Sequence, residues 1–373
     1  MKTISRFGAL LIMVVILAQP LWASEVLRIL TWHGYADADW VAEFERNNEV
    51  RVEVSFVESD DELWDKLSKN HGENYDVFAA NTAELQRYIA QNIVAALKKS
   101  RIPNSKNQLP RFRDTEKIAG LNRNGNLYAI PFTYSEMGLI YDKKQFKSPP
   151  NSMDALWLPQ YKGKIVLYDG SNHNFSLTAL TLNIDNPFQL SREQMNKTVT
   201  KLLALREQAP LFYTSPDESV RAFIKYKAAL MFANYGNQQL KQLQALDADI
   251  GYIIPKEGAL AWLDCWAITV GAKNKTLAEK WINFTLEKSI STALTRRQGL
   301  PNTLSRSNLQ DKDKIIWLEP SEDFALRTQY WDRIRAGKAR SNNQRPTKAI
   351  TSLGYVNFHP DRKALRLIAI QTR

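Results

Sequence analysis

The stretch VLRILTWHGYADADWVAEFERNNEVRVEVSFVESDDELWDKLSKNHGENYDVFAANTAELQRYIA, residues 26–90, decides the fold. Short apolar runs at 26–32, 50–56 and 75–80 predict strands, and the middle run alternates apolar with polar residues. Each run is followed by a polar segment whose apolar residues recur at helical spacing, which predicts a helix after each strand. Three strand–helix units in succession predict a mostly parallel sheet with helices packed on its faces.

The same alternation continues through the rest of the chain. Within the first stretch, helices are expected over 37–46 and 61–69, and Thr82 is expected to cap the third. No internal repeat or low-complexity linker divides the chain, so we expect two α/β lobes of one molecule and not independent domains. Further strands are predicted at 128–133, 137–141, 164–168, 228–232, 250–254 and 265–270, and Thr276 with Glu279 predicts a capping box before a later helix.

The N-terminus predicts an export signal. Lys2 and Arg6 form a basic start, residues 7–18 are an unbroken apolar run, and small residues follow at Ala23-Ser24. The apolar run is shorter than the ~20 residues that span a bilayer, so a cleaved signal peptide is favoured over a membrane anchor. We therefore expect residues 1–23 to be removed and the mature protein to be periplasmic.

The positive charge of the chain is concentrated at its C-terminus. The formal net charge is +11, and from Arg333 onward there are ten Lys or Arg residues and one acid, Asp361. The chain has no nucleic-acid-binding motif, so a solvated basic tail is favoured over a docking surface. Residues 338–373 are therefore expected to form a basic C-terminal extension, and no nucleic-acid partner is expected.

Sequence signatures of catalysis are missing. The chain has no GxSxG elbow, P-loop, HExxH or CxxC motif, and its four histidines are scattered without metal-ligand spacing. The single cysteine, Cys265, excludes an intrachain disulfide and an acylated N-terminal cysteine. We therefore expect a binding protein and not an enzyme, with no catalytic residue, no metal site and no cofactor.

Candidate binding residues lie where the predicted strands end, because ligands of open α/β sheets bind beyond the carboxyl ends of the strands. Trp262 and Asp264 are two residues apart, so their side chains face the same side of a strand, and an indole face beside a carboxylate suits a ligand ammonium. The alternative is that the tryptophans are core packing and Asp264 is an ordinary acid at a strand start. The candidate ligand-binding residues are Trp32, Tyr35, Asn81, Asp169, His173, Trp262 and Asp264.

Six short motifs accompany these residues: LTWHGY (30–35), YDVF (75–78), YAIPF (128–132), LWLPQYKGK (156–164), PKEG (255–258) and WLD (262–264). In this order and spacing they resemble the spermidine/putrescine-binding subgroup of the bacterial extracellular solute-binding proteins. The resemblance implies a type II periplasmic-binding-protein fold, with two α/β lobes joined by two crossover strands and a ligand cleft between the lobes. It places 24–132 and 261–305 in the first lobe, 133–260 and 306–337 in the second, and the crossovers near 130–135 and 254–261.

The resemblance also implies a polyamine site lined by Trp32, Tyr35, Trp262 and Asp264, with Asp264 holding an ammonium group. The chain departs from the family pattern elsewhere in this site. Gly170 and His173 stand where two acids are usual, Asn81 replaces a serine, and Ala83, Ala233 and Leu300 replace aromatic residues. The half of the site that would neutralise further nitrogens is thus altered. Glu136, Asp169 and Asp217 are the acids considered as substitutes.

The resemblance implies that the protein, expected to be a monomer, delivers its ligand to an inner-membrane ABC permease. The alternative is a sensor that docks on the periplasmic domain of a membrane signalling protein, and the charged extension favours it slightly. A polyamine, a smaller amine and an amino-acid-like ligand all remain open, and relatives bind sugars, thiamine or ferric iron. Iron sites usually need clustered tyrosines, and nothing in the sequence places its tyrosines together.

Overall fold

A computed structural model describes residues 25–306 and 313–337. Its strands are β1 (Val26–Thr31), β2 (Arg51–Phe56), β3 (Val77–Asn81), β4 (Val94–Ala95), β5 (Asn122–Arg123), β6 (Asn126–Leu127), β7 (Ala129–Asp142), β8 (Ile165–Tyr168), β9 (Leu211–Tyr213), β10 (Leu230–Ala233), β11 (Ile250–Ile253), β12 (Ala259–Thr269) and β13 (Ile315–Trp317). Its helices are α1 (Ala38–Asn48), α2 (Asp60–Ser68), α3 (Thr82–Ala90), α4 (Pro110–Arg113), α5 (Ser171–Thr181), α6 (Arg192–Arg206), α7 (Pro216–Lys225), α8 (Asn237–Gln244), α9 (Lys275–Thr285), α10 (Lys288–Gln298) and α11 (Phe324–Arg335).

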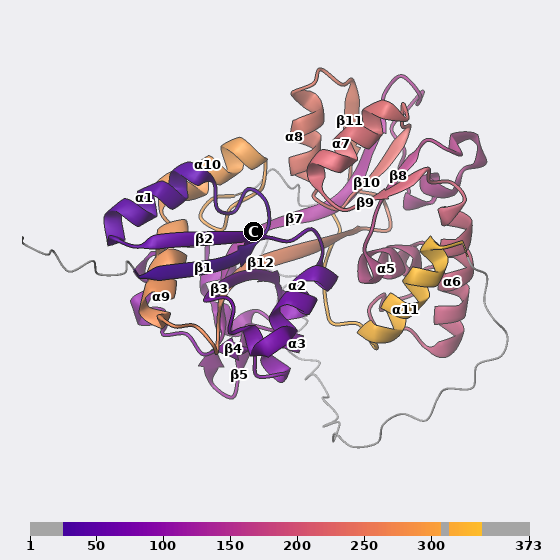
Figure 1. Cartoon of the computed structure of the whole chain (residues 1–373). Helices are drawn as coiled ribbons and strands as arrows, with labels where there is room; N and C mark the ends of the chain where they lie inside the picture. Colours follow the sequence, from indigo (N-terminus) through magenta and orange to yellow (C-terminus); the bar gives the residue numbers. More distant parts are fainter. Residues whose placement is uncertain (1–24, 307–312, 338–373) are drawn as a thin grey trace, which may run out of the picture.

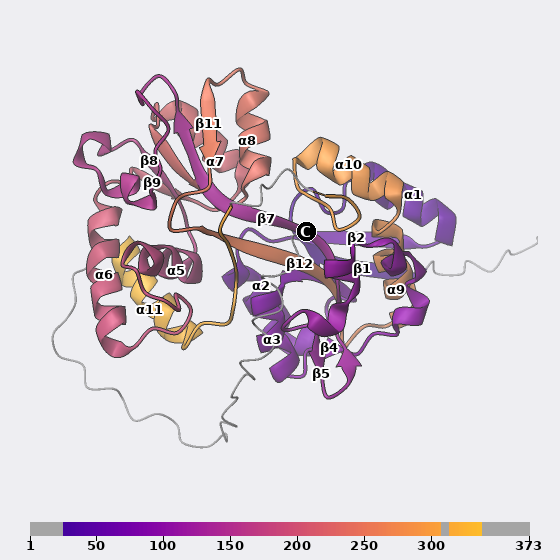
Figure 2. The ribbon, with the colours of Figure 1, turned by 180° about the vertical axis from the view of Figure 1, so that it is seen from behind.

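One mixed sheet runs through the molecule, within the described residues, and carries two lobes (Figure 1). Its strands are neighbours in the order β2-β1-β3-β12-β7-β10-β8-β9, with β4 and β13 paired to β12 and β11 paired to β7. The first lobe is built on β1, β2 and β3, and the second on β8, β9, β10 and β11. Seen from behind, β7 and β12 pass from one lobe to the other (Figure 2).

The first lobe confirms the predicted strand–helix units. β1 pairs in parallel with both β2 and β3. Alternation along β1 places Leu27 and Ile29 in a core cluster with Trp40 of α1, and Leu30 in a second cluster with Leu63 of α2. The sheet is therefore covered on both faces, by α1, α9 and α10 on one side and by α2 and α3 on the other (Figure 1).

Two predicted helix caps are wrong. Asn81, and not Thr82, caps α3, because its side-chain oxygen accepts hydrogen bonds from the backbone N–H groups of Ala83 and Glu84. The capping box expected at Thr276 and Glu279 does not form either. Asn274 caps α9, and the Glu279 carboxylate instead accepts hydrogen bonds from Lys98 and Arg101. In both cases an asparagine one or two residues earlier takes the capping position.

The two strands predicted at 128–133 and 137–141 are one continuous strand, β7, of 14 residues. Pro131 lies within it and has no N–H to donate to the sheet. The register with β12 shifts between Asp264 and Cys265, opposite Pro131, and the strand continues beyond this irregularity. β12 likewise begins at Ala259 and not at the predicted 265, so Asp264 lies in the middle of a strand.

β7 is shared by the two lobes. From Ala129 to Met137 it pairs with β12, and from Gly138 to Asp142 it pairs with β10 and β11. The described part of the C-terminal region also contacts both lobes. β13 pairs with the start of β12, while on α11 the Trp331 ring packs edge-on against Phe212, at 5.1 Å between centroids. The residue boundaries predicted for the lobes stay a prediction.

The predicted signal peptide, residues 1–23, and the predicted basic extension, residues 338–373, lie outside the described residues. Among the helices that the structure describes, none combines the length and apolar character needed to cross a membrane.

Candidate ligand-binding site

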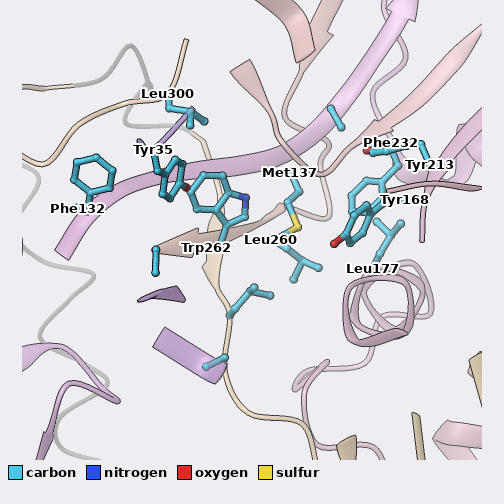
Figure 3. Packing of buried hydrophobic residues seen from close by; sticks show 14 of the residues in the cluster. Tyr35, Phe132, Met137, Tyr168, Leu177, Tyr213, Phe232, Leu260, Trp262 and Leu300 are labelled. Carbon is cyan, nitrogen blue, oxygen red and sulfur yellow. The ribbon is translucent and has the colours of Figure 1, made fainter. Parts of the chain in front are cut away.

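A cavity open to solvent lies between the two lobes at the carboxyl ends of β1, β2, β3, β8 and β10, and the empty space within its lining, open solvent included, is about 550 Å³. Six of the predicted site residues line it: Trp32, Tyr35, Asn81, His173, Trp262 and Asp264. The close-up in Figure 3 shows Tyr35 and Trp262 near each other on one side, and Tyr168 with Tyr213 on the other. The remaining lining residues are His33, Val57, Glu58, Asp60, Tyr168, Pro216, Asn234, Tyr235 and Gln238.

Asp264 is the acid most firmly fixed in this cavity. It lies on β12 between Asn81 of β3 and Thr133 of β7, and it is 6% exposed. The Tyr35 hydroxyl donates a hydrogen bond of 2.7 Å to its Oδ2. Burial raises the pKa of Asp264 to about 7, although the Tyr35 hydrogen bond opposes the shift. A cation placed beside this carboxylate would offset the cost of burying its charge.

Trp262 connects the two sides of the cavity. Its indole Nε1 donates a hydrogen bond of 2.9 Å to the backbone carbonyl of Asn234, which follows β10 in the second lobe. Among the fully buried side-chain atoms of the described lining residues, Trp32 Nε1 and Asn234 Oδ1 have no hydrogen-bond partner. The Trp262 ring is both packed in the core and part of the cavity wall.

Two acids that sequence reasoning missed, Glu58 and Asp60, also line the cavity. Asp60 begins α2 just after β2, and its Oδ1 accepts a hydrogen bond of 3.2 Å from Asn81 Nδ2. Burial, followed by the nearby Glu84 and Asp264 charges, raises the pKa of Asp60 well above its usual range. The strand-end rule that selected Trp32 and Asn81 applies equally to the acidic segment after β2, and would have found both residues.

The second lobe contributes His173 and two tyrosines. His173 lies in the first turn of α5, and burial lowers the pKa of its imidazole to about 4, so the ring is neutral at neutral pH. Its ring contacts Tyr168 at 5.4 Å between centroids, and Tyr168 meets Tyr235 edge-on at 5.8 Å. The Tyr235 hydroxyl lies 3.4 Å from the backbone carbonyl oxygen of Glu58, across the cleft.

Asp169 is not brought into the cavity. Its carboxylate accepts hydrogen bonds from Trp331 Nε1 at 2.7 Å and from Arg335 at 2.5 Å, and so ties α11 to the end of β8. The two other acids considered as replacements for the acids missing at Gly170 and His173 do not line the cavity either. Glu136 accepts a hydrogen bond from Asn237, and Asp217 accepts one from Gln242.

The structure does bring three tyrosines together, which the sequence did not indicate. Tyr168, Tyr213 and Tyr235 have ring centroids 5.6 to 6.3 Å apart. The hydroxyls of Tyr213 and Tyr235 donate hydrogen bonds to the backbone carbonyls of Phe232 and Thr214. These two phenols are therefore occupied with the backbone.

A second contact joins the lobes beside the cavity. The Arg87 guanidinium of α3 lies between two rings, 3.6 Å from the centroid of Trp64 on α2 and 3.8 Å from that of Phe324 on α11. Trp64 and Arg87 belong to the first lobe, and α11 packs on the second. The arrangement is a cation–π contact that crosses from lobe to lobe without reaching the cavity.

Comparison with known proteins agrees with this architecture. The spermidine/putrescine-binding periplasmic protein 1 of Haemophilus influenzae is 27% identical over 310 residues, covering 82% of this chain and 81% of the relative. The spermidine/putrescine-binding periplasmic protein of Escherichia coli is 24% identical over 334 residues, covering 84% of this chain and 93% of the relative.

A solved structure has the same fold. The spermidine/putrescine ABC transporter substrate-binding protein of Streptococcus pneumoniae superimposes with a TM-score of 0.64 at 21% identity, covering 84% of this chain and 99% of the other. The predicted type II fold with two lobes is thereby confirmed. The family described as bacterial extracellular solute-binding protein matches residues 39–317. Because that match spans most of the chain and both lobes, the chain belongs to the bacterial extracellular solute-binding protein family.

Proposed function

We propose that this chain is a periplasmic solute-binding protein that captures a polyamine between its lobes and delivers it to an ABC permease of the inner membrane. The observation that carries the proposal is the charge of the cavity. Among the lining residues that the structure describes, three are carboxylic acids, Glu58, Asp60 and Asp264, and none is lysine or arginine. The Haemophilus influenzae and Escherichia coli relatives, both named as spermidine/putrescine-binding, support the same ligand class.

The chemistry of the cavity favours an organic cation over the other ligands considered. A protonated amine forms charge-assisted hydrogen bonds with carboxylates, and its methylene chain packs against aromatic faces such as those of Trp32 and Trp262. A sugar or an amino-acid carboxylate would leave the acids uncompensated, which is costly at a buried position such as Asp264. An amine is therefore the ligand that the lining residues accommodate best.

Export, assembly and partner complete the proposal. We take residues 1–23 as a cleaved signal peptide, the mature protein as a monomer, and the permease as its partner. The two relatives are named as periplasmic proteins, and the Streptococcus pneumoniae protein is named as an ABC transporter substrate-binding protein. The sensor alternative rested on the basic extension, which lies outside the described residues. No contact within the described residues favours it.

A thermal-shift screen of the mature protein tests the proposal, with polyamines, amino acids, sugars, thiamine and ferric salts as ligands. Ligand at a hundredfold excess over Kd should raise the free energy of unfolding by about 2.7 kcal/mol. Stabilisation by amines alone is the expected result. Stabilisation by another class of ligand and by no amine would overturn the ligand assignment.

A further inference from the structure

Asp60 and His173 face each other across the cleft. Asp60 begins α2 of the first lobe, His173 lies on α5 of the second, and 3.9 Å separates Asp60 Oδ2 from His173 Nε2. This distance is too long for a direct hydrogen bond. Both residues line the main cavity and also a smaller adjoining recess. The recess is further lined by Ser59, Asp61, Tyr168, Gly170, Ser171, Asn172 and Phe324.

Both side chains keep unused hydrogen-bonding capacity. His173 is 6% exposed and makes no hydrogen bond to any side chain or backbone group in the described ranges. In those same ranges, the Asp60 carboxylate accepts a single hydrogen bond, from Asn81 to Oδ1, which leaves Oδ2 without one. Because the imidazole is neutral at neutral pH, its Nε2 can act as an acceptor when the proton resides on Nδ1. Two hydrogen-bond acceptors, Asp60 Oδ2 and His173 Nε2, therefore face each other across the 3.9 Å between them.

We propose that Asp60 Oδ2 and His173 Nε2 together hold a secondary ammonium group of the ligand. Such a nitrogen carries two N–H donors, one for each acceptor, whereas its two carbon substituents continue the chain in both directions. Further acids line the hollows on which the pair borders, Asp264 in the main cavity and Asp61 in the adjoining recess. The inference rests on the proposed function and narrows its ligand to a linear triamine with an internal nitrogen.

The spacing of the two acceptors fits this role. Two acceptors each about 2.8 Å from a tetrahedral nitrogen lie about 4.6 Å apart. The observed 3.9 Å thus needs to widen by less than ~1 Å, a movement within the range of interface adjustments on binding. A third donor, as in a primary ammonium, would find no additional acceptor on this pair. The pair therefore suits an internal nitrogen better than a chain end.

The test compares two probes of equal length. Norspermidine and 1,7-diaminoheptane have the same number of chain atoms between their terminal nitrogens, and only norspermidine has a nitrogen in the middle. Isothermal titration calorimetry of the protein purified from the periplasm should give norspermidine a Kd at least about tenfold lower, the usual worth of hydrogen bonds to a charged group. Equal affinities would overturn the inference while leaving the proposed function intact. Failure of both probes to bind would overturn the inference, and it would overturn the proposed function as well if no polyamine stabilises the protein in the thermal-shift screen.

Variants test whether Asp60 and His173 cause the preference for norspermidine over 1,7-diaminoheptane. In Asp60→Asn and in His173→Leu, the ratio of the two Kd values should fall to less than about threefold, because one of the paired acceptors loses its charge or is removed. Asp65→Asn, an exposed acid on the same helix, is the matched control and should keep the wild-type ratio. A preference that survives in both Asp60→Asn and His173→Leu would overturn the assignment to this pair. Since the comparison of probes is made on the wild-type protein, it stands even where a variant does not fold.

Discussion

The two walls of the cleft differ in charge. The wall from the first lobe carries all three lining acids, Glu58, Asp60 and Asp264. The wall from the second lobe presents Tyr168, His173, Pro216, Asn234, Tyr235 and Gln238, none of which is charged at neutral pH once burial has lowered the pKa of His173. One lobe therefore supplies the countercharge for a cation, and the other supplies aromatic faces and neutral acceptors.

This asymmetry suggests an order of events. A cation can pair with the acids of the first lobe while the cleft is still hydrated, because these acids are held by contacts within that lobe, such as Tyr35 with Asp264 and Asn81 with Asp60. Approach of the second lobe then excludes water and strengthens these charge interactions. Ligand favours the closed arrangement only by as much as it binds that arrangement more tightly than the open one.

The largest expected effect comes from removing a charge on the acidic wall. Asp264→Asn should cost about 3–5 kcal/mol of polyamine binding, because a buried ammonium loses its countercharge. Isothermal titration calorimetry with spermidine measures the change. The control is Asp249→Asn, an exposed acid of the second lobe that pairs with Lys143, and it should leave the affinity unchanged. Normal binding by Asp264→Asn would remove this carboxylate from the site.

A second effect concerns pH. Burial raises the pKa of Asp264 to about 7, so below this pH the empty site holds a proton that an ammonium must displace. Pairing with a cation lowers the carboxyl pKa, so binding releases protons and affinity should fall by up to about tenfold per pH unit below 7. The ligand amines stay protonated over this range.

Calorimetry between pH 5.5 and 8.5 checks this dependence, and repetition in buffers of different ionisation enthalpy counts the protons released. His173 should not contribute, because the pKa of its buried imidazole is about 4. In Asp264→Asn the pH dependence should weaken without vanishing, because burial also raises the pKa of Asp60, which lines the same cavity. A Kd that does not change with pH would show that no lining acid titrates on binding.

A smaller effect is expected from the aromatic contribution of the acidic wall. Trp32→Ala should cost less than about 2 kcal/mol of binding, since it removes one cation–π face and the packing area of one ring. Trp32→Phe retains a ring and should recover most of the loss. Calorimetric titration of both variants with spermidine measures the two losses of binding free energy. A loss in Trp32→Ala as large as that in Asp264→Asn would mean that the ring, and not the charge, dominates binding.

The smallest effect tests the contact between lobes that lies outside the main cavity, at the adjoining recess that Phe324 lines. Phe324→Ala removes the second-lobe ring that covers Arg87, and should weaken binding by about 1 kcal/mol by destabilising the closed arrangement. The loss should be seen as faster dissociation in stopped-flow measurements. Gln329→Ala, an exposed change on the same helix, is the control. If the rate of ligand dissociation is unchanged in Phe324→Ala, the Arg87 contact has no role in closure.

The sequence predicted the two walls unequally, for a physical reason. Period-two and helical patterns reveal elements, so the strands and the residues at their ends, Trp32 and Asn81 among them, could be located from the sequence. Strand-end position alone does not determine where a side chain goes. Asp169 follows β8 as expected, yet its carboxylate is taken by Trp331 and Arg335 of a helix more than 150 positions later in the chain. Contacts of that kind have no local signal.

The missed acids and the misread strand have different causes. Glu58 and Asp60 follow a strand that had been identified, and were overlooked because an acidic segment before a helix resembles an ordinary helix start. The single strand β7 was divided because Ser135 and Glu136 interrupt its apolar pattern between the two predicted strands, and only the pairing with β12 reveals that the strand continues through them. Tertiary pairing here overrides a local rule.

The continuity of β7 has a mechanical consequence. The strand pairs with β12 in one half and with β10 and β11 in the other, so no loose loop separates the lobes along it. Relative motion of the lobes must therefore twist a hydrogen-bonded ribbon, with the deformation spread over many small rotations, and not swing on two or three residues. Such a connection deforms elastically along its whole length. The curvature of β7 in the ligand-free protein therefore sets the distance between the two walls of the cleft before ligand binds.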